Sequence, residues 1–167
     1  MICAASTVTV VLAAAAVTGP GCGCQGRPRH AAPAGAVTAA GRTWQVELVT
    51  DPGAQSVGLA YRDSLPTDRG MLFAFPQSRP RTFHMLNCRF PIDIAFLDAN
   101  RRVVRTHTMA VEPRGQAERK YRSGAPARYA LEVNAGQLAE AGVKTGTEVR
   151  FSPELDARIK AAFPAGR

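Results

Sequence analysis

The chain has 167 residues, 21 basic and 13 acidic side chains, and a formal net charge of +8. This length suits one domain with a single substantial core, so we expect one domain rather than several. The densest group of arginines, at residues 114–128, contains only one tyrosine, which gives no support to a nucleic-acid groove built on aromatic stacking. We therefore expect a solvated basic surface and no nucleic-acid partner.

The N-terminus carries an apolar block at residues 8–17, and no charged residue precedes Arg27. Ten residues are about half of what a membrane-spanning helix needs and are typical of an export signal. We predict that residues 1–24 form a signal peptide or a lipoprotein signal, with Cys22 and Cys24 as candidate lipidation sites. The predicted location is outside the cytoplasm, in the periplasm or attached to the inner or outer membrane through that lipid alone.

Residues 25–41 are rich in Ala, Pro and Gly, and this composition predicts a flexible tether. Residues 42–152 follow as the folded domain, and residues 153–167 as a C-terminal helix. Cys88 is then the single cysteine of the folded domain, so the sequence offers no disulfide framework, although pairing with Cys24 stays open.

Hydrophobic periodicity predicts mainly strands within the domain. Trp44, Val46 and Leu48 alternate with polar positions as in a half-buried strand. Thr50 or Asp51 can cap a short helix that begins at Pro52. The predicted strands cover residues 42–50, 71–75, 82–88, 92–97, 103–108, 129–133 and 147–151. Loops are expected at residues 76–80 and 114–128, and further short helices after Asn134 and Ser152.

These elements predict a mainly β fold with two or three short helices. The tight turn after residue 97 indicates a hairpin and a meander of antiparallel strands. A single antiparallel sandwich, a jelly-roll-like domain and a partly closed barrel all fit this pattern.

Four segments carry a resemblance to a known family. They are GLAYRDSL at 58–65, GMLFAF at 70–75, FHMLNCRFPIDIAFLD at 83–98 and YALEVNAGQLAEAGVKTGTEVRF at 129–151. In this order they resemble the domain of unknown function 192 family, an uncharacterised prokaryotic family with many exported members. The resemblance implies a compact, mainly β domain without an established activity. The chain departs from the family pattern at four positions, with His84 for tryptophan, Leu86 for lysine, Cys88 for threonine and Ala60 for methionine.

Asp93 is the sharpest candidate for a site, because it interrupts the apolar run from Ile92 to Leu97. A buried carboxylate needs a hydrogen bond or an ion pair, and Asn87, Arg62 and backbone amides are the candidate partners. We predict a small polar cleft lined by Asp93, Asn87 and Arg62, with His84 nearby. A purely structural role for Asp93 stays open, as does a general acid paired with Glu132 or Glu47.

Two other chemistries are alternatives to this cleft. Imidazole and sulfur ligands favour Cu(I), and His107, Met109 and Met85 are the candidate ligands, although methionines in apolar runs are usually core. Cys88 could act as a nucleophile with His84 or His107. We expect neither a metal nor a cofactor, because the sequence contains no CxxC, HExxH or nucleotide-binding motif.

The sequence thus predicts a non-enzymatic, exported binding or accessory domain, monomeric, that meets a small ligand or a component of the cell envelope. The alternative is a small hydrolase that uses Asp93 as acid or base, and we expect Asp93→Asn to separate the two.

Overall fold

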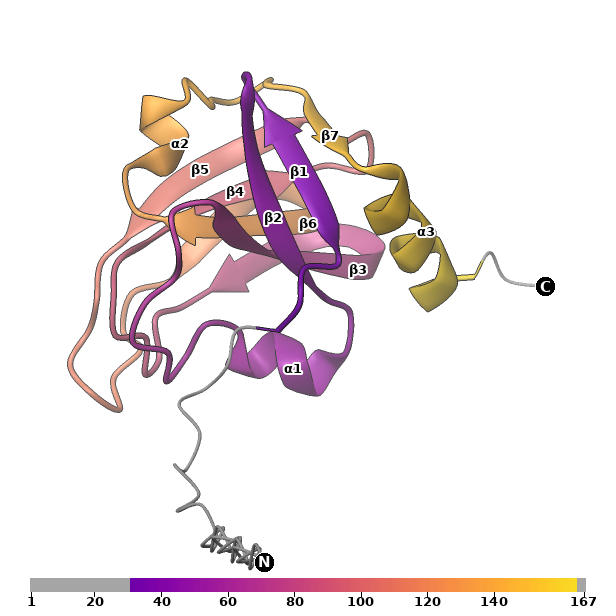
Figure 1. The fold of residues 1–167 in the computed structure, drawn as a ribbon. Coiled ribbons are helices and arrows are strands. Elements are labelled where there is room, and N and C mark those ends of the chain that lie inside the picture. The colour runs from indigo at the N-terminus through magenta and orange to yellow at the C-terminus, as the bar shows by residue number, and fades with distance from the viewer. Residues whose placement is uncertain (1–30, 165–167) are drawn as a thin grey trace, which may run out of the picture.

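The computed structural model describes residues 31–164, which form one sheet of seven strands and three short helices (Figure 1). The strands lie in the order β5-β4-β6-β3-β2-β1-β7. Their bounds are β1 Gly35–Ala39, β2 Arg42–Val49, β3 Arg69–Phe83, β4 Ile92–Leu97, β5 Val103–Met109, β6 Tyr121–Asn134 and β7 Val149–Phe151. The helices are α1 Pro52–Val57, α2 Gln137–Glu140 and α3 Pro153–Ala162.

The sheet is curled into a partly closed barrel, which confirms the predicted mainly β fold. Its two edge strands approach each other at one end, where Arg102 and Glu148 form an isolated antiparallel bridge. The Val103 N–H also donates to the carbonyl oxygen of Thr147 at 2.9 Å. Most strand pairings are antiparallel, in keeping with the mainly antiparallel sheet that the sequence predicts. The pairing of β2 with β3 is parallel, because α1 and its loop carry the chain back between these two strands. In the expected meander, β4 and β5 are neighbours, whereas β6 lies between β3 and β4.

Three predicted boundaries are corrected by pairing between distant strands. β1 lies inside the predicted tether, because its small residues fit between β2 and β7, where Val37 and Ala39 are buried. β3 continues through the predicted loop at 76–80, and β6 begins within the predicted loop at 114–128. Shifts of register between these two strands let them tolerate their prolines, and Pro80 faces Pro126 directly.

The predicted strand at 82–88 is shorter than expected, because β3 ends at Phe83. The Cys88 N–H donates to the Met85 carbonyl oxygen at 3.1 Å, which closes a turn. Asn87 sits in this turn with φ of 57°, a left-handed conformation that Asn tolerates better than most residues. Residues 84–91 therefore form a loop that folds back toward α1.

Apolar side chains cover both faces of the central strands. One face carries Trp44, Leu72 and Leu131, and α2 and α3 pack against it through Leu138 and Leu155. The opposite face carries Phe73, Ile94 and other buried residues of β3 and β4. All six residues of β4 are buried, which explains why this strand reads as a continuous apolar run.

The predicted N-terminal signal, with Cys22 and Cys24, lies outside the described residues. Within residues 31–164, no helix has the length and apolar character required to cross a membrane. The predicted C-terminal helix is present as α3, whose N-terminus is capped by the Ser152 hydroxyl and whose Leu155 and Ile159 are buried.

Candidate functional site

A cavity of about 470 Å³ opens between α1, the middle of β3 and the 84–88 loop. Its volume lies in the range of small-molecule sites. It combines apolar side chains with a few polar groups. The lining residues are Pro52, Gln55, Ser56, Val57, Gly58, Leu59, Phe73, Phe75, Pro80, Arg81, Thr82, Phe83, His84, Leu86, Cys88 and Glu132.

The helix that forms one side of the cavity is fixed by its ends. Asp51 caps α1 by accepting from the Ala54 N–H at 2.9 Å, and Pro52 occupies the first turn. Gly58 ends the helix with φ of 52°, and a Cβ there would lie 3.2 Å from the Phe73 ring. The Gln55 amide donates to the carbonyl oxygen of Ala74 at 2.9 Å. These contacts hold α1 above β3 with little freedom.

Three phenylalanines from β3 form the apolar part of the cavity. Phe73 and Phe83 meet edge to face with their ring centroids 5.0 Å apart, although they lie ten positions apart on the same strand. The bend of β3 allows this contact. The Arg81 guanidinium lies 3.8 Å from the centroid of the Phe75 ring, a cation–π contact that places a positive charge in the cavity lining.

Glu132 is the deepest polar group of the cavity. It lies on β6 between Met71 of β3 and Ile94 of β4, and only 5% of its surface is exposed. Among residues 31–164, none hydrogen-bonds its carboxyl group. A carboxyl group in such a place is poorly solvated and free to meet a ligand.

Burial raises the pKa of Glu132 to about 8, and the nearby Arg62 guanidinium opposes this rise. Arg62 is engaged elsewhere, since its two terminal nitrogens donate to the two carboxylate oxygens of Glu47 at 2.6 and 2.8 Å. Most of the positive charge of Arg62 is therefore matched by Glu47 rather than by Glu132. At neutral pH Glu132 is mainly protonated and offers one O–H donor to the cavity.

Cys88 and His84 line the same cavity from the loop after β3. Burial raises the pKa of the Cys88 thiol to about 12, and Glu132 contributes to this rise. Such a thiol is a poor nucleophile at neutral pH, which does not favour the cysteine alternative. His84 is exposed, and its Nδ1 accepts from the Leu86 N–H at 3.4 Å.

Asp93 lies on the other face of the sheet. Its carboxylate accepts hydrogen bonds from the Thr108 hydroxyl at 2.7 Å and from the Leu138 N–H at 3.0 Å. Only 2% of its surface is exposed, and it lines neither the cavity with Glu132 nor the cavities that contain Arg62 and Asn87. The side chain thus links β4 to β5 and to the start of α2. This is the purely structural role for Asp93 that the sequence left open.

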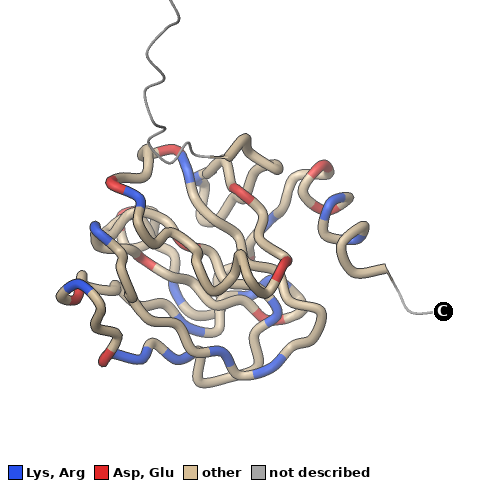
Figure 2. The backbone as a smooth tube through the Cα atoms, turned by 90° about the horizontal axis from the view of Figure 1, so that it is seen from below, with Lys and Arg blue, Asp and Glu red and all other residues tan. Residues whose placement is uncertain are grey.

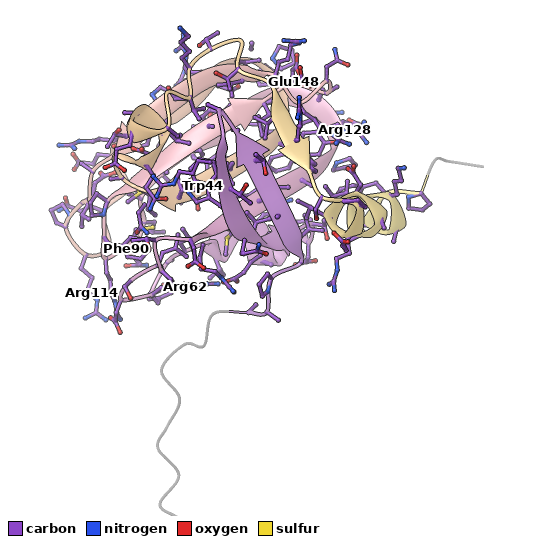
Figure 3. The ribbon with its side chains drawn as sticks, turned by 45° about the horizontal axis from the view of Figure 1, so that its top comes forward. Trp44, Arg62, Phe90, Arg114, Arg128 and Glu148 are labelled. Carbon is purple, nitrogen blue, oxygen red and sulfur yellow. The ribbon has the colours of Figure 1, made fainter. Side chains whose placement is uncertain are left out.

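The four side chains expected to form one cleft are not brought together. Arg62 lines a cavity beside Glu47, Asn87 lines a third cavity of about 360 Å³, and His84 lines the cavity with Glu132. The Asn87 amide donates to the Tyr61 hydroxyl at 2.8 Å. Figure 3 shows Arg62 near Phe90 and Arg114 at one end of the molecule, away from Glu148 and Arg128.

The described residues contain no group of three or more His, Cys, Asp or Glu side chains that could hold a metal ion. Of the copper candidates, Met85 and Met109 are fully buried in the apolar layer. The Nε2 of His107 lies 2.9 Å from the carbonyl oxygen of Arg122, and its ring packs against Phe96 and Tyr121. Apolar packing and these contacts of His107 explain the positions of the three side chains, and no metal is needed to explain them.

Sequence reasoning missed the central roles of Glu132 and Arg81 in the cavity. The available signal for Glu132 was a charged residue inside the apolar strand YALEV, the same signal that singled out Asp93. The two differ only in which face of the sheet they occupy and in what covers that face. No comparable signal marked Arg81, which lies between the predicted loop at 76–80 and the predicted strand at 82–88.

Comparisons with known proteins agree with this fold. Residues 35–151 match the family model DUF192, described as an uncharacterized ACR. The crystal structure of a protein of unknown function from Novosphingobium aromaticivorans DSM 12444 is similar, with 30% identity, a TM-score of 0.62, and coverage of 69% of this chain and 83% of that chain. A "putative transcription regulator" from Sinorhizobium meliloti 1021 has 32% identity, a TM-score of 0.62, and coverage of 74% and 98%. A comparison with curated proteins gives no match.

Proposed function

Because the chain belongs to the domain of unknown function 192 family, which is uncharacterized, we propose a function from the cavity itself: reversible binding of a small, partly apolar ligand. The ligand enters between α1 and β3, lays its apolar part against the phenylalanines, and offers a hydrogen-bond acceptor to Glu132. The protein acts as an exported binding or accessory domain and carries out no reaction on the ligand.

One observation carries this proposal. Glu132 is buried in the lining of an open cavity, and no described residue hydrogen-bonds its carboxyl group. The carboxyl oxygens of Glu132 are not among the enclosed polar atoms without a partner in the described residues, so they reach the open cavity. A hydrogen bond from a ligand to this group contributes about 0.5 to 1.5 kcal/mol. Asp93 has its donors within the protein, as a scaffold residue should, whereas the Glu132 carboxyl group faces the cavity.

A binding role is favoured over catalysis by the chemistry of the lining. A hydrolase needs an activated nucleophile or two acid–base groups placed on either side of a substrate. Here the thiol of Cys88 is mainly protonated, and Glu132 has no second carboxyl group in the lining of the cavity. The arrangement suits recognition through one hydrogen bond and apolar contact.

The first test is native mass spectrometry of the full chain purified from its own host, followed by titration with the co-purifying molecule. Two variants address the cavity: Phe83→Ala removes part of its wall, and Ser56→Trp fills its mouth from an exposed position on α1. Glu148→Gln is the matched control, because this exposed side chain lies at the far edge of the sheet.

We expect both cavity variants to weaken binding by at least about tenfold and the control to bind as the wild type does. Because Phe83→Ala also affects the core, its binding is compared below its own unfolding temperature. A molecule that binds the Ser56→Trp protein with unchanged affinity would contradict the proposed site.

A further inference from the structure

The lining of the cavity is electrostatically asymmetric, and this asymmetry selects among ligands. Resting on the proposed binding function, we infer that the ligand is a small organic acid whose carboxylate pairs with Arg81 at the side of the cavity while its uncharged part faces Glu132. Arg81 thus binds the anionic group of the ligand, and Glu132 binds its neutral hydrogen-bond acceptor at a separate place in the cavity.

Arg81 is held in position before any ligand arrives. Its Nε donates to the carbonyl oxygen of Ala127 and one terminal nitrogen donates to that of Gln77, while its guanidinium plane covers Phe75. These partners are neutral, and none of the ion pairs among the described residues includes Arg81. An ordered guanidinium without a carboxylate partner is well suited to bind an anion.

The surroundings of Arg81 add positive charge. Residues 76–83 of β3 and residues 121–128 of β6 form a paired ribbon with four arginines and no acidic residue: Arg79, Arg81, Arg122 and Arg128. Burial and the charge of Arg79 both lower the pKa of Arg81, so an anion nearby would stabilise the charged guanidinium. In Figure 2, several basic positions, drawn in blue, follow one another along the lower edge of the molecule. The local field therefore favours an anion and opposes an amine.

Glu132 acts at the other end of the ligand. The charged or titratable groups around it are Arg62 from the loop after α1, Glu47 of β2 behind Arg62, Cys88 and His84 from the 84–88 loop, and Arg81 in the same lining. In its protonated form Glu132 donates a hydrogen bond and adds no negative charge to the cavity. Ionisation at higher pH places a negative charge in the cavity and repels an anionic ligand.

The test uses three probes of the same shape and different charge: 3-phenylpropanoate, 3-phenylpropan-1-ol and 3-phenylpropan-1-amine. Binding to the full chain is measured by calorimetry and by NMR chemical shifts at pH 7 and pH 9. Arg81→Gln removes the proposed anion partner. Arg122→Gln is the matched control, because it removes the same charge from the same ribbon at a residue that does not line the cavity.

We expect the acid to bind about tenfold or more tightly than the amine, which is the effect of one charge-assisted hydrogen bond. Arg81→Gln should remove this preference and leave the affinity for the alcohol within about twofold, whereas Arg122→Gln should change both little. The wild type should lose affinity for the acid between pH 7 and pH 9, and Glu132→Gln should not.

The outcomes separate the two proposals. If the alcohol binds in the cavity but the acid has no advantage, or if Arg81→Gln leaves that advantage intact, the inference about the acid is wrong and the binding function stands. If none of the three probes shifts resonances of the cavity residues, the result counts against the binding function as well.

Discussion

The raised pKa of Glu132 makes the stability of the protein depend on pH in an unusual direction. In the unfolded chain this carboxyl group ionises near its ordinary pKa of 4.5, whereas in the folded protein it ionises at about 8. Between these values the folded state binds the extra proton, so the free energy of unfolding falls as pH rises. The slope is about 1.4 kcal/mol per pH unit and the full effect about 5 kcal/mol, a large part of a typical domain's stability.

Glu132→Gln removes this dependence, because glutamine resembles the protonated acid at every pH. We expect the variant and the wild type to have similar free energies of unfolding near pH 4.5. Above pH 8 the variant should be the more stable protein by up to about 5 kcal/mol. The thiol of Cys88, whose pKa Glu132 helps to raise to about 12, stays protonated in the folded protein over the pH range of the assay. The difference between the two stabilities therefore reports mainly on Glu132.

The assay is urea unfolding at pH 5, 6, 7, 8 and 9, followed by the fluorescence of Trp44, the single tryptophan, which is fully buried. Glu148→Gln serves as the control, because its side chain is 58% exposed and its difference from the wild type should stay flat with pH. If the Glu132→Gln difference is also flat within about 1 kcal/mol, the argument that burial keeps this carboxyl group protonated is refuted.

Three further predictions follow from contacts outside and inside the cavity. Asp93→Ala should lower the free energy of unfolding by about 3 kcal/mol or more, because the Leu138 N–H and the Thr108 hydroxyl lose their acceptor. Ligand affinity, measured on the protein that remains folded, should not change. A loss of affinity would instead show that Asp93 is part of the site. Gly70→Ala should cost about 1 to 3 kcal/mol in urea unfolding, because its Cβ would lie 2.9 Å from the Glu132 carbonyl oxygen between β3 and β6; wild-type stability would show that the strands move apart easily. Iodoacetamide at pH 8 should alkylate native Cys88 about a thousandfold more slowly than the unfolded chain, since the thiol pKa is raised from 9.0 to about 12, and equal rates would contradict this.

The local sequence determined much of the architecture. β4 and the hairpin into β5 were predicted closely, because a run of apolar and β-branched residues followed by a tight turn leaves few alternatives. The starts of α1 and α3 were also predicted, because a capping side chain before a proline satisfies the first backbone N–H groups locally. Of the two caps expected for α1, Thr50 or Asp51, the structure uses Asp51. The family motifs were sufficient to identify the family.

Only the tertiary structure decided which segments pair at long range. β1 was hidden in a stretch of small residues, and the first half of β6 in a stretch rich in arginine, proline and glycine. Both become strands because a partner strand supplies their hydrogen bonds, a contribution that composition does not contain.

The site depended on the same distinction. Asp93 and Glu132 are both acidic residues inside apolar strands, but burial was predicted for Asp93 alone. Strand pairing places Asp93 against two donors on one face and Glu132 in an open cavity without a donor on the other. The apolar run around Asp93 was enough to predict its burial, because its neighbours in the chain are all apolar. Only the packing of α1, α2 and the 84–88 loop determines which of the two carboxyl groups faces a cavity.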